Sequence, residues 1–198
     1  MPLARPGPQL VLASRSPQRR AILEQLGVDF RAIDPGVEEA SAGDPSRIAL
    51  ENAERKARAG ADAVSGSSIV LGVDTVVALD GRIYDKPRDA GEARATLSAL
   101  GARRHAVLSA IAVIRPGRPA RAPVDGRVEV TQVEFRPLSP ALIGWYVGSG
   151  EWRGRAGGYA IQGRGAALVR RIEGDYLNVV GLPLGALLDL LPELVPGA

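Results

Sequence analysis

The sequence predicts a mixed α/β fold that forms one domain over residues 1–198. A chain of 198 residues suits one hydrophobic core, because two separate cores of half this size would each be marginally stable. Apolar residues make up 45% of the chain and charged residues 24%, which is typical of a globular protein. Short β-branched segments and capped helical segments also follow one another in a mixed α and β order.

The first half of the chain opens with a strand, a turn and a helix. Residues 9–13 are a short apolar strand, and Pro17 suits the first turn of a helix that runs to about Leu26 before Gly27. The elements expected next are a strand at 30–33, a helix from Pro45 to about 63 with Asp44 as its cap, and a long strand at 69–79 that turns through Asp80-Gly81 into a short strand ending at 84.

The second half continues the mixed order without an internal repeat. The expected elements are a helix at about 89–100, strands at 105–114 and 127–135 joined by a Pro/Gly-rich hairpin tip at 115–126, a helix at 139–147 with Ser139 as its cap, a strand at 161–169 and a Leu-rich terminal helix at 183–191. No linker is long enough to predict a domain boundary.

Cysteine is absent and His105 is the only histidine. This composition excludes disulfides, thiol catalysis, Cys/His zinc sites and iron–sulfur clusters, so any metal ion must be a hard cation bound by oxygen. A Ser-His-Asp hydrolase would need His105 as its base, but Ser14 and Ser16 lack the context of a nucleophile elbow. We expect His105 to be structural or to lie on an edge strand. The sequence also has no Walker-type loop and no dinucleotide-binding fingerprint.

The net charge is only +3, which does not predict strong non-specific binding to nucleic acid. No segment is long enough for a membrane span, and the apolar run at 10–13 is too short for the core of a signal peptide. We therefore expect a cytoplasmic protein, and the sequence leaves a homodimer open.

Only two of the 25 cationic side chains are lysines, Lys56 and Lys86. At about 100° per residue, Lys56 falls on the small-residue face of its helix, opposite the charged face; that small-residue face carries Ala49, Ala53, Ala57 and Gly60. A desolvated ammonium is costly there unless it meets an anion. The alternative is a lysine that extends along the edge of the stripe to solvent. We favour a functional lysine that waits for a ligand phosphate and adds nothing to the stability of the unliganded fold.

Asp74 interrupts the apolar run at 69–79, where an unpaired carboxylate is seldom found. It either caps a local turn or pairs with a core arginine, or it binds a cation or moves a proton. Lys86 precedes Pro87 and is therefore expected to be extended, just beyond the hairpin. It is either an exposed loop lysine or a side chain that projects back toward Asp74.

Further polar residues complete a candidate site. Ser14 and Arg19 lie at a helix start, where anions are attracted, and Glu38 and Glu39 are acidic neighbours. The Gly-rich stretch 154–165 allows close backbone approach, and Gln162 offers both a donor and an acceptor. Together these residues predict a pocket for a polyphosphate with a divalent metal ion.

These residues lie in motifs that resemble the Maf-type nucleotide pyrophosphatases. The ordered motifs are LASRSPQRRAILEQLG, GVEE at 36–39, ENAERKA around Lys56, LGVDTVV around Asp74, YDKP with Lys86, RAGGYAIQG ending at 163, and GDYLNVVGLPL. The resemblance runs from about Leu10 to Leu191. Gln18 stands where the family usually has arginine, and Arg155 stands where it often has lysine.

The resemblance implies a mixed-sheet, two-lobed fold with a central cleft, similar to the inosine-triphosphate pyrophosphatases. It also implies hydrolysis of a nucleoside triphosphate, chiefly dTTP or UTP, to monophosphate and pyrophosphate, with Mg²⁺ or Mn²⁺. The implied functional positions are Ser14, Arg19, Glu39, Lys56, Asp74, Lys86 and Gln162. Asp74 and Glu39 would hold the metal, Arg19 and the two lysines the phosphates, and Gln162 the base. Whether Asp74 is a metal ligand, a general base or both stays open.

Two alternative functions remain. The chain could bind a nucleotide without turnover and act as a regulator of cell division, or it could hydrolyse modified purine nucleotides. Measurement of pyrophosphate release from a panel of triphosphates separates these alternatives.

Overall fold

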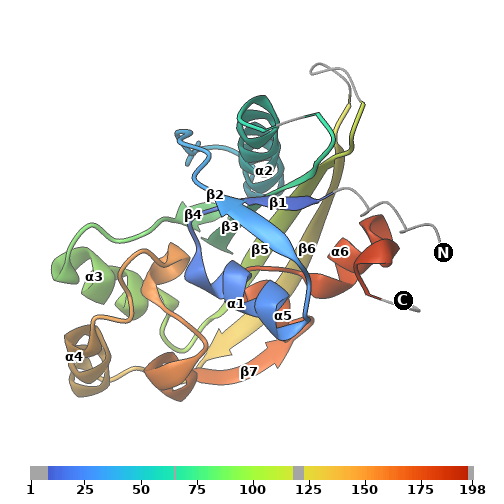
Figure 1. The fold of residues 1–198 in the computed structure, drawn as a ribbon. Helices are drawn as coiled ribbons and strands as arrows, with labels where there is room; N and C mark the ends of the chain where they lie inside the picture. Colours follow the sequence, from blue (N-terminus) through green and yellow to red (C-terminus); the bar gives the residue numbers. More distant parts are fainter. Residues whose placement is uncertain (1–8, 65, 118–122, 196–198) are drawn as a thin grey trace.

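The computed structural model shown in Figure 1 describes residues 9–64, 66–117 and 123–195 and contains a seven-stranded mixed sheet. Six strands follow the order β2-β1-β3-β5-β6-β7, and β4 pairs with β3. The three strands β2, β1 and β3 are parallel to one another, and the remaining pairs are antiparallel. The strands are β1 (Leu10–Ala13), β2 (Phe30–Ile33), β3 (Ile69–Leu79), β4 (Arg82–Tyr84), β5 (Arg104–Ile114), β6 (Asp125–Phe135) and β7 (Val169–Glu173).

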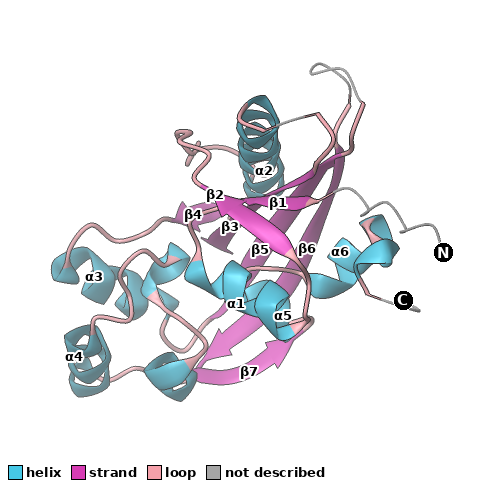
Figure 2. Ribbon diagram, viewed as in Figure 1, coloured by secondary structure: helices cyan, strands magenta, loops and turns pink. Residues whose placement is uncertain are grey.

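Six α-helices of the described chain surround this sheet (Figure 2). Ser16, Asp44, Asp89 and Ser139 each cap a helix by accepting a hydrogen bond from a backbone N–H three residues later, which confirms the predicted Asp44 and Ser139 caps. The helices are α1 (Pro17–Gln25), α2 (Pro45–Asp62), α3 (Ala90–Leu100), α4 (Pro140–Ser149), α5 (Tyr176–Val180) and α6 (Leu184–Leu190). In the described chain, none of these helices is both long and apolar enough to cross a bilayer.

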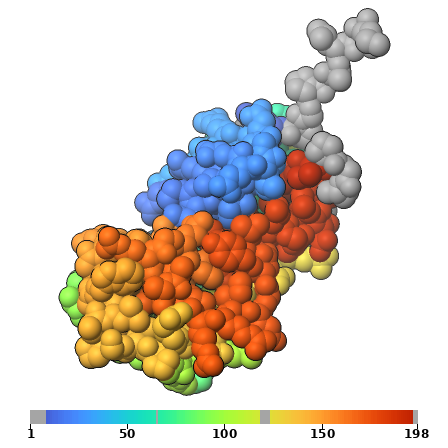
Figure 3. Space-filling view, turned by 90° about the horizontal axis from the view of Figure 1, so that it is seen from below, coloured from blue at the N-terminus to red at the C-terminus, as the bar shows by residue number. Residues whose placement is uncertain are grey.

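The two faces of the sheet are covered differently. Helix α2 packs its small residues on one face, where Ala49, Ala53 and Ala57 meet Val76 and Leu108. On the other face, α1 and α6 bury a leucine-rich cluster at one end of the sheet, and α3 and α4 bury an aromatic cluster at the other end. In Figure 3 the N-terminal segment, in blue, lies directly against the C-terminal segment, in orange and red. Segments far apart in sequence therefore meet beside the sheet.

A gap along one side of β3 positions the functional site. Strand β1 pairs with residues 69–72 of β3, and β4 pairs with residues 77–79. Between them, residues 73–76 have no strand on that side in the described sheet. Adjacent side chains of a strand point to opposite faces, so Asp74 lies on the α2 face and Thr75 on the α1 face. At the gap both side chains border the same pocket.

The prediction of a strand at 161–169 is wrong. Residues Gly163–Ala167 form a 3₁₀ helix, and β7 begins only at Val169. Gly163 has a φ of +61°, and a Cβ on Gly165 would lie 1.6 Å from the carbonyl oxygen of Ala160. The backbone therefore folds back on itself here, which an extended strand cannot do.

One helix was not expected, and one expected connection is shorter than predicted. The unexpected helix is α5, whose five residues are too few to give a periodic pattern in the sequence. In the expected hairpin tip at 115–126, residues 118–122 lie outside the described chain, and β6 begins at Asp125 within the expected connection.

His105 is structural, as expected, but it does not lie on an edge strand. It belongs to β5, which pairs with β3 and β6 on its two sides. Its ring packs edge-on against Phe135 and Tyr159, and Nε2 lies 2.9 Å from the Tyr159 hydroxyl. Burial lowers the pKa of His105 to about 4.

We expect the free energy of unfolding to fall by about 3 kcal/mol through His105 as the pH drops from 7 to 4. The unfolded chain protonates this histidine below its ordinary pKa of about 6.5, whereas the folded chain does not until about pH 4. Denaturant unfolding at both pH values checks this for the parent and for His105→Gln, which does not titrate. An equal pH dependence in the two proteins would contradict the prediction.

Candidate active site

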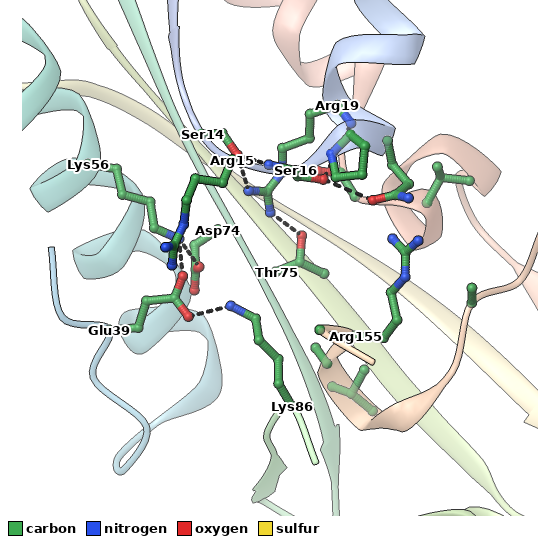
Figure 4. Close-up of a pocket in the computed structure, with 18 of the residues that line it drawn as sticks. Ser14, Arg15, Ser16, Arg19, Glu39, Lys56, Asp74, Thr75, Lys86 and Arg155 are labelled. Carbon is green, nitrogen blue, oxygen red and sulfur yellow. Dashed lines mark hydrogen bonds and ion pairs between the residues drawn. The ribbon is translucent and has the colours of Figure 1, made fainter. Parts of the chain in front are cut away.

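A pocket of about 630 Å³ opens beside the gap in the sheet. The end of β1, the start of α1, the loop before α2, β3, and the loop between α4 and β7 all contribute to its lining. Figure 4 shows Lys56, Glu39, Asp74 and Lys86 gathered on one side of the pocket, with Arg155 on the other. Six cationic and four acidic side chains line it, an excess of positive charge that suits an anionic ligand: Arg15, Arg19, Lys56, Lys86, Arg153 and Arg155, against Asp34, Glu38, Glu39 and Asp74.

Lys56 bridges two carboxylates at the buried end of the pocket. Its Nζ donates to Asp74 Oδ1 and to Glu39 Oε1, each at 2.5 Å, and to the Val73 carbonyl at 3.3 Å. The side chains of Lys56 and Asp74 are only 7% and 5% exposed. Lys56 therefore does not extend to solvent. Asp74 pairs with a buried cation, as one interpretation of the sequence expected, but this cation is a lysine and not an arginine. Lys56 also does not wait unpaired for a phosphate, because it already neutralises Asp74.

Asn52 holds the second oxygen of Asp74. Its Nδ2 donates to Asp74 Oδ2 at 3.1 Å and to the carbonyl oxygen of Ala40 at 2.9 Å, while its Oδ1 accepts from the Ala40 N–H at 2.8 Å. One amide thus ties α2 to β3 and to the loop that carries Glu39. Asn52 was not expected from the sequence, although it lies one helical turn before Lys56 on the same small-residue face.

Glu39 joins the buried lysine to the second lysine of the chain. Its Oε2 accepts from Lys86 Nζ at 2.6 Å, so Lys86 projects back toward the site and is not a free loop lysine. Partial burial alone would raise the pKa of Glu39, but the ion pairs with Lys56 and Lys86 lower it to about 2. Glu39 is therefore an anion at every physiological pH.

Arg19 is a buried cation held by uncharged acceptors. Its Nε donates to the Gly181 carbonyl at 2.8 Å, and its two terminal nitrogens donate to Ser14 Oγ at 2.9 Å and to Thr75 Oγ1 at 3.0 Å. Burial lowers the pKa of this guanidinium, and the nearby Asp74 and Glu39 act in the opposite direction. Arginine stays protonated in proteins, so Arg19 presents a fixed positive charge at the pocket. Thr75 was not expected from the sequence, where its only signal is its place next to Asp74.

Gln162 lies in the loop between α4 and β7 and lines the pocket, as do Arg153 and Arg155. Ile161 beside it is buried and anchors the loop, while Gln162 is exposed toward the cavity. Gln18 and Arg15 also line the pocket. All seven residues singled out from the sequence therefore border one cavity: Ser14, Arg19, Glu39, Lys56, Asp74, Lys86 and Gln162.

The carboxylates of Glu39 and Asp74 fit a divalent cation. Oxygen is the ligand type that Mg²⁺ and Mn²⁺ prefer. One oxygen of each carboxylate accepts from Lys56 Nζ, and a carboxylate oxygen has a second lone pair that could bind a cation beside the lysine. Within the described chain, no group of three or more acidic or histidine side chains converges on a metal position. A cation here would draw its remaining ligands from substrate phosphates and water, which is usual for Mg²⁺.

Comparisons with known proteins agree on one family. A family model described as "Maf-like protein" matches residues 9–194. The dTTP/UTP pyrophosphatase of Anaeromyxobacter sp. (strain Fw109-5) is 47% identical over 186 residues, which cover 92% of this chain and 88% of that protein. That of Thermus thermophilus is 45% identical over 184 residues, covering 93% and 94% of the two chains.

Solved structures that are similar to this chain include two proteins of low sequence identity. A nucleoside-triphosphatase, or dITP/XTP pyrophosphatase, from Mycobacterium abscessus has a TM-score of 0.48 at 19% identity and covers 96% of this chain and 100% of its own. A HAM1 protein from Coxiella burnetii has a TM-score of 0.46, also at 19% identity, over 65% and 73% of the two chains.

Proposed function

Because this chain belongs to the family of Maf-like proteins, we propose that it hydrolyses dTTP and UTP to the nucleoside monophosphate and pyrophosphate. The observation that supports this most directly is the ion-paired cluster of Lys56, Asp74 and Glu39, in which Lys56 and Asp74 are buried, at the end of a cationic pocket. Such a cluster combines phosphate-binding charge with a carboxylate that can act on water.

The triphosphate would be bound by the cations of the pocket. Arg19 is fixed by three acceptors, so its guanidinium needs no reorganisation when a phosphate arrives. Lys86 donates to Glu39 and keeps further N–H groups for a phosphate oxygen. Lys56 already donates to Glu39, Asp74 and the Val73 carbonyl, so it would contribute its positive charge near the phosphates. Ser14 adds a hydroxyl in the turn between β1 and α1, close to the N-terminal end of a helix whose dipole favours negative charge. These contacts would stabilise the pyrophosphate leaving group, whose charge grows in the transition state.

Asp74 is the proposed group that orients and deprotonates the attacking water. Its carboxylate is held by Lys56 on one oxygen and by Asn52 on the other, which fixes its direction at the sheet gap. With Glu39, Asp74 would also hold Mg²⁺ or Mn²⁺, and such a cation supplies charge neutralisation at the phosphates when it is bound. Attack at the α-phosphorus breaks the bond to the bridging oxygen, which leaves with pyrophosphate.

The remaining parts of the proposal concern the whole molecule. We infer a single catalytic domain over residues 1–198, a cytoplasmic location and no stable nucleic-acid partner. A homodimer is the oligomer to look for, and sedimentation measures it directly.

Pyrophosphate release from dTTP, UTP, CTP, the purine triphosphates and modified triphosphates, with Mg²⁺ or Mn²⁺, tests the proposed function. We expect release to be fastest from dTTP and UTP. Nucleotide binding without pyrophosphate release would instead support a regulator of cell division. Fastest pyrophosphate release from a modified purine triphosphate would support an enzyme that hydrolyses modified purine nucleotides.

Gln162→Ala is expected to flatten the preference among bases. The amide of Gln162 offers a donor and an acceptor, which match a carbonyl and the ring N–H of uracil or thymine. A base that leaves such groups unpaired is penalised by about 1–3 kcal/mol per group. The ratio of kcat/KM for dTTP to that for CTP measures this preference. If the variant instead loses all substrates equally, Gln162 does not read the base.

A further inference from the structure

Glu151 holds the backbone directly after Gln162 without lining the pocket itself. Its carboxylate accepts hydrogen bonds from the N–H of Arg164, at 3.0 Å to Oε2 and 3.2 Å to Oε1, and from the N–H of Gly165 at 3.3 Å. These donors lie in the first turn of the 3₁₀ helix at 163–167, for which Gln162 supplies no side-chain cap. Glu151 therefore replaces Gln162 as the cap and leaves its amide free of that task.

The backbone before Gln162 is held from the same helix. The Tyr146 hydroxyl accepts from the N–H of Ala160 at 3.0 Å, and the Tyr146 ring is fully buried in the core. Tyr146 lies in the last turns of α4, and Glu151 follows the Gly150 cap of that helix. One end of α4 thus fixes both sides of the turn at 160–165.

The turn is tightly packed at the two glycines that follow Gln162. A Cβ on Gly163 would lie 3.1 Å from Glu151 Oε2, and a Cβ on Gly165 would overlap the Ala160 carbonyl at 1.6 Å. Gln162 stands between these two glycines and Ile161, which is buried. The hydrogen bonds to Tyr146 and Glu151 hold the backbone on either side of Gln162 and so help to set its place at the cavity.

We propose that Glu151, assisted by Tyr146, is a positioning residue for base selection: it fixes Gln162 so that the amide meets a pyrimidine edge. The proposal rests on the proposed function, in which Gln162 reads the base. A carboxylate suits the task because both of its oxygens only accept, whereas an amide would turn a donor toward a backbone N–H. Loss of a charge-assisted hydrogen bond at this point loosens the turn and weakens discrimination without touching the phosphate contacts.

The test is Glu151→Gln, measured by calorimetric binding of the α,β-imido analogues of dTTP and dCTP and of inorganic tripolyphosphate, which has no base. We expect the preference for the thymine analogue over the cytosine analogue to fall by about tenfold, while the affinity for tripolyphosphate stays within about twofold. Glu173→Gln is the matched control. Glu173 lies on β7, away from the pocket, and forms an exposed ion pair with Arg104 of β5. This variant should change neither quantity.

The outcomes separate the two proposals. If the parent binds both analogues equally, Gln162 does not read the base, and the role of Glu151 falls with that premise. If the parent discriminates and folded Glu151→Gln discriminates equally well, only the role of Glu151 is overturned. A parallel loss of tripolyphosphate affinity would also overturn it, since the effect would not be confined to the base. Should Glu151→Gln not fold, Tyr146→Phe removes the other hydrogen bond to the turn, and an unchanged preference in that variant overturns the proposal.

Discussion

Replacing Asp74 with asparagine is expected to reduce pyrophosphate release from dTTP by about a thousandfold, the range associated with loss of a general base. Asparagine keeps the shape of the side chain but cannot accept a proton from water. It also removes one of the two anions at the proposed metal position. Steady-state pyrophosphate release with saturating Mg²⁺ measures the effect.

The same variant should remain folded. Lys56 keeps its ion pair with Glu39 and its hydrogen bond to the Val73 carbonyl, so the ammonium is not left without a partner. Asp80→Asn provides the control. Asp80 follows β3, the strand that carries Asp74, and its ion pair with Arg103 is exposed, so this variant should change neither turnover nor the free energy of unfolding by much. Normal turnover in folded Asp74→Asn would remove Asp74 from the proposed chemistry.

Much of the fold could be predicted because its signals are local. The β-branched run at 69–79 and the capping residues Asp44 and Ser139 fix elements through short-range physics, and the structure has them where the sequence places them. The inward direction of Lys56 and the buried place of Asp74 followed from the same periodicity, because a charge on an apolar face requires a partner.

The parts that could not be predicted depend on contacts between distant segments. The turn at 160–165 takes its shape from Glu151 and Tyr146, whose approach no local pattern reveals. The clamp of Arg19 on Gly181 joins residues 162 positions apart. Sequence periodicity also showed that Lys56 points inward but not that Asp74 and Glu39 already surround it.

That pairing changes what is expected of Lys56→Met. An unpaired lysine waiting for phosphate could be removed without loss of stability, but this lysine compensates a buried carboxylate. Its removal leaves Asp74 with the Asn52 amide as its remaining side-chain partner, and breaking a buried pair in this way costs about 3 kcal/mol. We therefore expect Lys56→Met to lose both pyrophosphate release and free energy of unfolding, the latter measured by denaturant titration.

Lys86→Met separates catalysis from stability. The Lys86 side chain is 48% exposed, and an ion pair at such a position contributes about 0–1 kcal/mol, so this variant should lose turnover with little change in the free energy of unfolding.

The double variant Lys56→Met/Asp74→Asn should regain most of the stability lost in Lys56→Met, because no buried carboxylate then lacks a counter-ion. It should stay inactive. If the two single losses of stability simply add in the double variant, the Lys56–Asp74 pair is not what stabilises this region. The cost of Lys56→Met would then come from lost packing between α2 and β3.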